Sequence, residues 1–146
     1  MRAMTITAFG EPDVLKLADF PKPQPGPEDL LIEVHAAALN PVDTKIRRGM
    51  HGDKPFPLVP GYDVSGVVVA MGSAVDRDLF KEGDEVYASP SLARPGAHAE
   101  FVAVDHRTAA RRCSSTRAQA AWGTSACNWR RTPAAASSPP PRDLRR

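Results

Sequence analysis

Short stretches in which apolar and polar residues alternate recur along the first 105 residues of the chain. Alternation of this kind is typical of β-strands that bury one face, and turn-forming residues separate the stretches. Six segments fit the pattern, namely residues 4–8, 14–17, 30–38, 62–71, 85–88 and 97–104. Their spacing predicts an antiparallel barrel or sandwich rather than repeated strand–helix–strand units.

The longest early stretch, residues 30–38, follows a segment with proline at every second position from Pro21 to Pro27. Since proline has no N–H to donate to a strand ladder, we expect that segment to be an extended loop. In the strand after it, alternation predicts two faces. One face carries Ile32, Val34 and Ala36, and the other carries Leu31, Glu33 and His35.

One short helix is expected between residues 40 and 49. Asn40 is a good N-cap, Pro41 suits the first helical position, and Asp43 places an acid in the first turn. Gly49 then ends the helix after one or two turns.

The glycines of the chain do not form a dinucleotide-binding loop. Gly61, Gly66 and Gly72 have the wrong spacing for GxGxxG, and they flank a strand instead of opening a helix. Gly66, inside the strand, indicates a bulge or a close backbone approach.

Charge divides the chain near residue 105. Up to that point 10 Lys and Arg face 16 Asp and Glu, a net −6, whereas the remainder has 9 Arg against one acid, Asp143, a net +8. The later part holds both cysteines and both tryptophans but no Val, Ile, Phe, Tyr or Met. Because so little apolar surface cannot offset the ordering entropy, we expect a domain at 1–105 and a disordered or loosely helical tail at 106–146.

Several function classes find no support in the residues. The four histidines and two cysteines lack the spacing of a metal site, and no apolar run is long enough to cross a membrane. A cytoplasmic protein without a signal peptide is the expectation. An Arg-rich tail could bind nucleic acid, but no groove motif accompanies it and the acidic domain would oppose docking on phosphate.

Four polar residues stand at the mouths of otherwise apolar elements, where a pocket could gather them: Asn40, Asp43, Tyr62 and Asp63. From the residues alone, two interpretations stay open. Asn40 and Asp43 can be a helix cap and Tyr62 and Asp63 a strand start, or all four can line a site.

Taken together, five stretches resemble the amino-terminal GroES-like domain of the medium-chain dehydrogenases and reductases, and within it the zinc-free quinone oxidoreductase branch. They are residues 4–12, 21–49, 59–72, 80–88 and 96–105, including "VPGYDVSGVVVAMG" and "GAHAEFVAVD". The resemblance implies a mainly β fold, a GroES-like partly open β-barrel with one or two short helices. The family's Rossmann domain is missing from this sequence, which contains no glycine-rich pyrophosphate loop.

The resemblance also implies that no zinc is bound. Zinc-dependent relatives carry a cysteine where this sequence has Asn40, and a histidine and a glutamate where it has Tyr62 and Asp63. Neutral amide and phenol groups are poor replacements for thiolate and imidazole ligands. The segment 89–95, which corresponds to the structural zinc lobe of those relatives, has no cysteine.

In zinc-free relatives, NADPH passes hydride to a quinone or an enone. By resemblance, Asn40 faces the nicotinamide and the acceptor, Asp43 organises that corner, and Tyr62 donates a hydrogen bond. Lys45 and Asp63 are expected in the substrate pocket. Because no loop for the cofactor's pyrophosphate is present, we expect this chain alone to bind no NADPH and to be inactive, as a truncated reductase.

Two further hypotheses concern the tail and the partners. A reading-frame disruption near Arg111 or Arg112 explains a tail of Arg, Ala, Pro and Ser that only faintly echoes the family's linker. Alternatively, the chain is a non-catalytic interaction module whose exposed Rossmann-docking face takes a partner or a second copy of itself.

Overall fold

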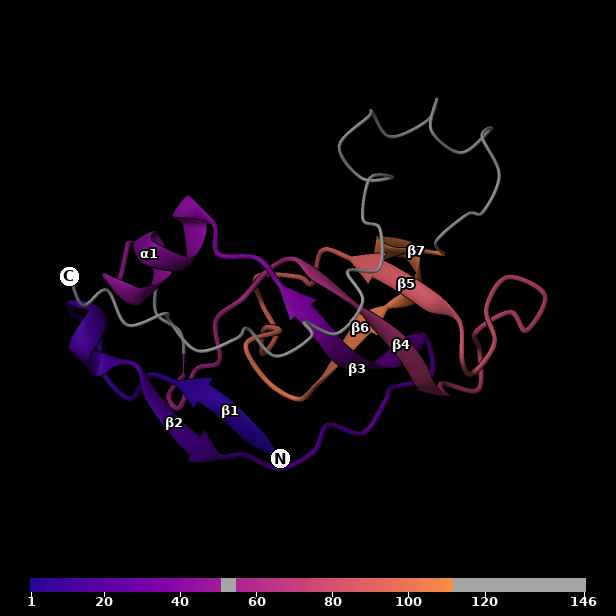
Figure 1. The fold of residues 1–146 in the computed structure, drawn as a ribbon, viewed down its shortest axis with the longest axis horizontal. Coiled ribbons are helices and arrows are strands. Elements are labelled where there is room, and N and C mark those ends of the chain that lie inside the picture. The colour runs from indigo at the N-terminus through magenta and orange to yellow at the C-terminus, as the bar shows by residue number, and fades with distance from the viewer. Residues whose placement is uncertain (51–54, 112–146) are drawn as a thin grey trace, which may run out of the picture. The chain divides into compact units, whose positions relative to one another are not determined.

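Two antiparallel sheets and one α-helix make up the part of the chain that the structure, a computed structural model, describes, which is residues 1–50 and 55–111. Figure 1 shows the arrangement of the elements. In chain order they are β1 (Arg2–Thr5), the 3-10 helix η1 (Pro12–Val14), β2 (Lys16–Asp19), β3 (Asp29–Ala37), α1 (Pro41–Arg47), β4 (Val64–Met71), β5 (Glu85–Ala88), β6 (Phe101–Asp105), the 3-10 helix η2 (His106–Thr108) and β7 (Ala109–Arg111).

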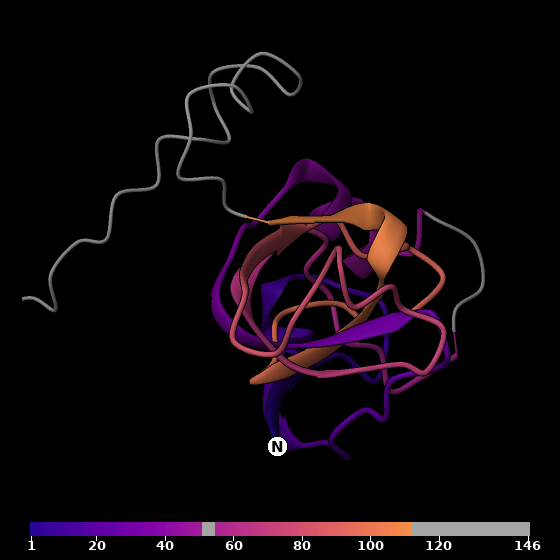
Figure 2. The same cartoon turned by 90° about the vertical axis from the view of Figure 1, so that its right-hand side faces the viewer.

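The larger sheet has the strand order β6-β3-β4-β5-β7, and every neighbouring pair is antiparallel. Its strands curl around the interior, as Figure 2 shows, which gives the expected partly open GroES-like barrel. The predicted role of Gly66 is confirmed: it faces Val34 next to a bulge in β3, and a Cβ there would lie 2.0 Å from the Glu33 carbonyl oxygen. Only glycine permits this approach.

The main core fills the interior of this sheet. Ile32 is fully buried and Val34 is half-buried, while Glu33 and His35 are exposed, as the alternation predicts. Leu31 differs, since it is only 5% exposed although it belongs to the other face. Leu30 and Ile32 on the opposite face are fully buried, so the start of β3 is buried on both of its faces.

A second apolar cluster joins the N-terminal hairpin to the helix. Its buried members are Ile6, Ile46, Leu58 and Tyr62. The backbones of Ile6 and Leu58 bond each other at 2.9 and 3.0 Å, which ties the chain after β1 to the segment before β4. Burial of Ile46 then docks α1 against both.

Several predicted boundaries shift in the structure. The predicted strand at 4–8 occurs as β1 at Arg2–Thr5, and the one at 14–17 is divided between η1 and β2 because Pro12 takes a first helical position. The strands predicted from residues 62 and 97 begin at Val64 and Phe101. The residues before them bond each other across the two segments, with Ala97 donating to the Gly61 carbonyl at 2.7 Å.

The sheet continues beyond residue 105, where the tail was predicted to begin. Asp105 caps η2 by accepting from the Arg107 N–H at 2.9 Å, and β7 then pairs with β5. The folded part therefore reaches at least Arg111. The disordered or loosely helical tail was predicted for residues 106–146, and of these, residues 112–146 lie outside the described residues.

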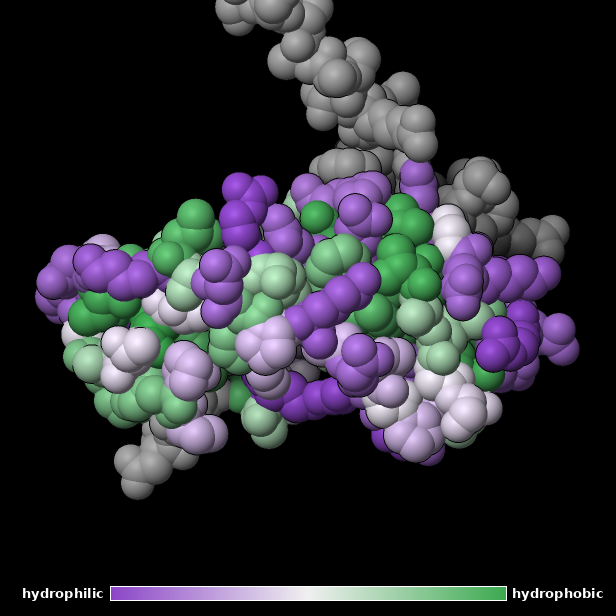
Figure 3. All heavy atoms as spheres, turned by 90° about the horizontal axis from the view of Figure 1, so that it is seen from below, coloured by the Kyte–Doolittle hydropathy of each residue, from purple (hydrophilic) through white to green (hydrophobic). Residues whose placement is uncertain are grey.

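The described surface mixes polar and apolar side chains, as Figure 3 shows for one face. Large apolar side chains that are exposed include Phe9, Leu17, Leu39, Met50, Phe56 and Leu79. Within residues 1–50 and 55–111, no helix has the length and apolar character needed to cross a membrane.

Candidate functional site

A buried carboxylate, that of Asp43, joins the start of α1 to the segment before β4. Its Oδ2 accepts from the Asn40 N–H at 2.7 Å, and its Oδ1 accepts from the Gly61 N–H at 2.8 Å. Asp43 is the third residue of α1, so the first bond is the reciprocal half of a capping box. The second bond lies outside the helix and makes this cap a link between two segments 18 residues apart in sequence.

A second link lies beside the first. The Asn40 side-chain Nδ2 donates to Asp63 Oδ2 at 2.7 Å, and the Ala38 N–H donates to the Asp63 carbonyl at 3.1 Å. Asn40 and Asp63 are both half-buried. The two links fix Asn40 from its backbone and from its side chain, a double restraint that we call the Asn40 corner, formed by Asn40, Asp43, Gly61 and Asp63.

Tyr62 lies behind this corner. Its side chain is 3% exposed and packs in the cluster of Ile6, Ile46 and Leu58. Burial, and secondarily the negative charge of Asp43, raise the pKa of its hydroxyl above 10.0. A hydrogen bond from Tyr62 to a ligand stays a prediction, because in this structure the ring belongs to the packing that backs the corner.

The remaining predicted residue, Lys45, is not part of the corner's hydrogen bonds. It lies on α1 one turn after Pro41, and it is exposed. The structure thus brings together Asn40, Asp43, Tyr62 and Asp63, and leaves Lys45 on the helix surface.

His98 is a member of the site that was not selected from the sequence. Its backbone N–H donates to the Pro60 carbonyl at 2.9 Å, and its ring Nε2 lies 3.4 Å from the Ala38 carbonyl oxygen. The ring packs on Gly61, whose φ of +101° suits glycine and where a Cβ would come within 2.6 Å of His98 Cδ2. Residues 61 and 98 are far apart in sequence, so no local signal points to this contact.

The corner does not suit zinc. Asn40 and Asp63, at two of the positions that resemblance assigns to metal ligands, are hydrogen-bonded to each other, so the amide nitrogen already engages a carboxylate oxygen. An amide N–H cannot ligate a cation, and the buried phenol of Tyr62 is neutral. Across residues 1–50 and 55–111, no group of three or more His, Cys, Asp or Glu side chains could hold a metal ion.

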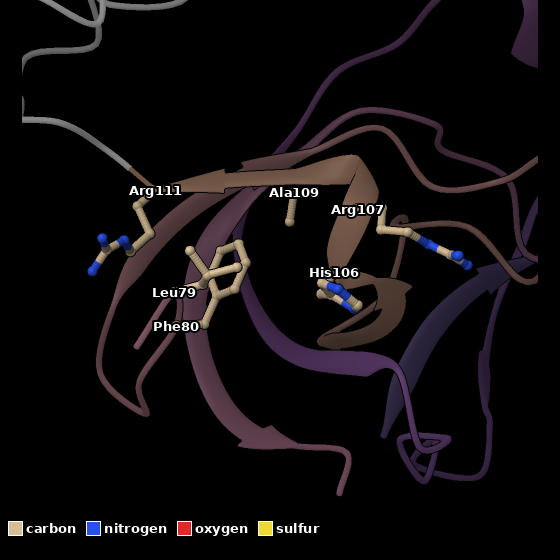
Figure 4. Close-up of a pocket in the computed structure, with 6 residues that line it drawn as sticks. All are labelled: Leu79, Phe80, His106, Arg107, Ala109 and Arg111. Atoms are coloured by element: carbon tan, nitrogen blue, oxygen red, sulfur yellow. The ribbon is translucent and has the colours of Figure 1, made fainter. Parts of the chain in front are cut away.

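An open pocket of about 470 Å³, separate from the Asn40 corner, is shown in Figure 4. It is lined by Leu79, Phe80, His106, Arg107, Ala109 and Arg111. Its cations are engaged within the protein. Arg107 pairs with Asp105 and with Glu28, and Arg111 lies 3.7 Å from Asp84. None of the predicted site residues lines this pocket, so it is not the candidate site.

Comparison with known proteins identifies the domain. Residues 26–127 match the family described as the alcohol dehydrogenase GroES-like domain. The chain is 50% identical over 116 residues to the chloroplastic NADPH-dependent alkenal/one oxidoreductase of Arabidopsis thaliana, an alignment that covers 73% of this chain and 30% of the relative. It is 44% identical over 109 residues to the quinone oxidoreductase of Homo sapiens, covering 73% of this chain and 32% of that protein.

Among solved structures, the quinone oxidoreductase from Coxiella burnetii superposes with a TM-score of 0.69 at 35% sequence identity. The superposition covers 78% of this chain and 37% of that one. The chain spans about a third of the length of the curated relatives it matches.

Proposed function

Because the chain belongs to the medium-chain dehydrogenase/reductase family through its alcohol dehydrogenase GroES-like domain, we propose that it is the acceptor-side domain for NADPH-dependent reduction of a quinone or an enone. The observation that carries this proposal is the doubly restrained Asn40. A residue whose backbone and side chain are both held by hydrogen bonds is suited to orient a planar ligand.

Asn40 is the residue proposed to face the nicotinamide and the acceptor. Its amide nitrogen has two hydrogens, of which one points to Asp63 when they bond at 2.7 Å, and the half-buried residue keeps access to solvent. When bound, NADPH supplies the hydride. The protein then needs a donor where negative charge develops on the acceptor oxygen, and the second amide hydrogen of Asn40 can provide it.

The neighbours of Asn40 have positioning roles in this proposal. Asp43 holds the backbone of Asn40 through a bond of 2.7 Å, and Asp63 sets the rotamer of its side chain. Tyr62 and the residues around it supply the apolar backing. Lys45, exposed on α1, is proposed to border the acceptor.

The nucleotide part of the cofactor is not accounted for by this sequence. No GxGxxG motif occurs in its 146 residues. The described strand pairs are all antiparallel, whereas a nucleotide-binding unit of the Rossmann type has a parallel sheet. We therefore propose that the purified chain alone does not oxidise NADPH with saturation kinetics in the presence of phenanthrenequinone. Saturable oxidation would refute this part of the proposal.

Binding of the acceptor is the test of the proposal's core. Ligand-observed saturation-transfer NMR is expected to detect phenanthrenequinone on the wild-type chain and to lose most of the signal with Asn40→Leu. Leu79→Ser is the control, since Leu79 is 52% exposed and lines the separate pocket. Loss with Leu79→Ser but not with Asn40→Leu places the quinone elsewhere and rejects the proposal.

A second candidate function, an interaction module, is favoured by one observation. Leu39, the residue next to Asn40, is 74% exposed, which is high for a large apolar side chain. A partner or a second copy that covers this face would bury it. Light scattering after size exclusion is expected to give a dimer or larger species for wild type and a monomer for Leu39→Lys if this function holds, and a wild-type monomer excludes self-association.

A further inference from the structure

The loop of residues 89–96, between β5 and β6, contacts the segment 59–62 along both of its ends. At the first end, Ser89 Oγ donates to the Tyr62 carbonyl at 2.9 Å. At the other end, the Gly96 N–H donates to the Val59 carbonyl at 2.8 Å. The loop is therefore hydrogen-bonded at both of its ends to the segment whose Gly61 N–H donates to Asp43.

The middle of the loop packs on the apolar backing of the corner. Leu92 lies against the cluster that contains Tyr62 and Ile46. Within the loop itself, the backbone bonds are local: the Arg94 N–H donates to the Ser91 carbonyl at 3.1 Å, and the Ala93 N–H donates to Ser91 Oγ at 3.3 Å. Bonds of this kind set the turn but do not attach it to the sheet.

An ion pair attaches the middle of the loop to the first residue of β3. Arg94 Nη1 and Nη2 donate to Asp29 Oδ1 and Oδ2 at 2.8 and 2.5 Å, a two-pronged contact with the first residue of β3. Asp29 is 6% exposed and also accepts from the Gly26 N–H at 2.9 Å. Paired, partly buried contacts of this geometry are among the stronger polar interactions of proteins.

The surroundings of Asp29 agree with a persistent pair. The hydrogen bonds from Arg94 lower the pKa of the Asp29 carboxyl, against the opposing effect of burial. The bonds to Asp29 raise the pKa of the Arg94 guanidinium, and the negative charge of Asp105, at the end of β6, raises it further, so Arg94 stays charged.

We propose that Asp29 and Arg94 are positioning residues for the Asn40 corner, acting through the loop 89–96. Their pair holds the loop against segment 59–62. That segment in turn holds Asp43 through the Gly61 N–H, and Asp63, the residue that follows the segment, holds Asn40. This inference rests on the proposed function only in treating Asn40 as the ligand-facing residue. The mechanical coupling itself needs neither cofactor nor acceptor.

The test uses the full chain and compares Arg94→Gln with wild type. Hydrogen exchange at the Gly61 amide, which bonds Asp43, is expected to quicken at least about tenfold, and the side-chain amide resonances of Asn40 are expected to shift. The Val68 amide, which bonds the Asp84 carbonyl within the main sheet, serves as the internal reference and is expected to keep its rate. Arg2→Gln is the matched control, since it removes an exposed pair with Glu100 at 3.0 Å.

Unchanged exchange at Gly61 in Arg94→Gln overturns the proposal, and so does an equal quickening at Val68, which means general loss of stability. Should Arg94→Gln not fold, Arg94→Lys keeps the charge but not the paired geometry, and the same difference between Gly61 and Val68 is expected in smaller degree. If exchange at Gly61 and at Val68 changes by the same factor in Arg94→Lys, the proposal is overturned. Failure of quinone binding, by contrast, rejects the proposed function and leaves this coupling standing.

Discussion

Asp43 Oδ1 accepts a hydrogen bond from the Gly61 N–H at 2.8 Å, while its Oδ2 accepts from the Asn40 N–H. Both bonds are satisfied by a single carboxylate that is 3% exposed. A helix cap predicted from the sequence and a site residue implied by resemblance are therefore the same side chain. For Asn40 and Asp43 the helix-cap interpretation is confirmed, and their role in a site stays a prediction. The strand start expected at Tyr62 and Asp63 lies at Val64 instead.

Asp43→Asn tests this double role. An amide presents one oxygen and one NH₂, so one of the two backbone donors would face another donor in a buried place. We expect the free energy of unfolding to fall by about 1–3 kcal/mol in urea denaturation. Asp76→Asn is the control, because Asp76 makes a similar bond to the Asp78 N–H at 2.8 Å but is exposed; an equal loss there would count against a special role for Asp43.

Gly61→Ala tests the packing of His98 on the corner. Gly61 has φ +101°, and a Cβ would lie 2.7 Å from the His98 backbone nitrogen. Gly83 has a similar φ of +91° with nothing within 4 Å, so Gly83→Ala measures the backbone strain alone. We expect Gly61→Ala to destabilise the protein by about 1–3 kcal/mol more than Gly83→Ala in thermal or urea unfolding. Equal losses of unfolding free energy in the two variants would mean that His98 moves to make room for the added methyl group.

The Asp29–Arg94 pair predicts an acid-sensitive component of stability. The pKa of Asp29 is lowered in the folded protein from 3.8, chiefly by the bonds from Arg94. A lowered folded pKa contributes stability that is present above the unfolded value, and that stability is lost as the pH falls toward the folded value. Between pH 6 and pH 3, wild type should therefore lose more unfolding free energy than Asp29→Asn. Parallel losses in the two proteins would show that Asp29 contributes none of the acid sensitivity.

Much of the fold follows from local pattern, and the failures have identifiable causes. The helix at 41–47 follows from Asn40, Pro41 and Asp43, since caps are encoded within one turn. The alternation in residues 30–38 predicts β3 to within one residue at each end. The bond from Asp43 to Gly61 and the contact of His98 with Gly61 were not predictable, because they join segments through the packed fold.

Tyr62 and the domain boundary show the limit of composition and alternation. The apolar pattern places the start of a strand at Tyr62, but β4 begins at Val64. The Gly61 N–H instead bonds the Asp43 side chain, and the Asp63 carbonyl accepts from the Ala38 N–H. A shift in composition at residue 105 gave no sign of β7, because strand pairing is made by the backbone and Ala109–Arg111 needs only the free edge of β5.

The most direct test of the central proposal, that Asn40 faces the acceptor, is a titration of the ¹⁵N-labelled chain with phenanthrenequinone, followed at the Asn40 side-chain amide. We predict that the Asn40 and Asp63 signals shift together and saturate, while signals of Leu79 and Arg107 at the separate pocket stay in place. Saturating shifts at Leu79 and Arg107 with none at Asn40 would contradict the proposal.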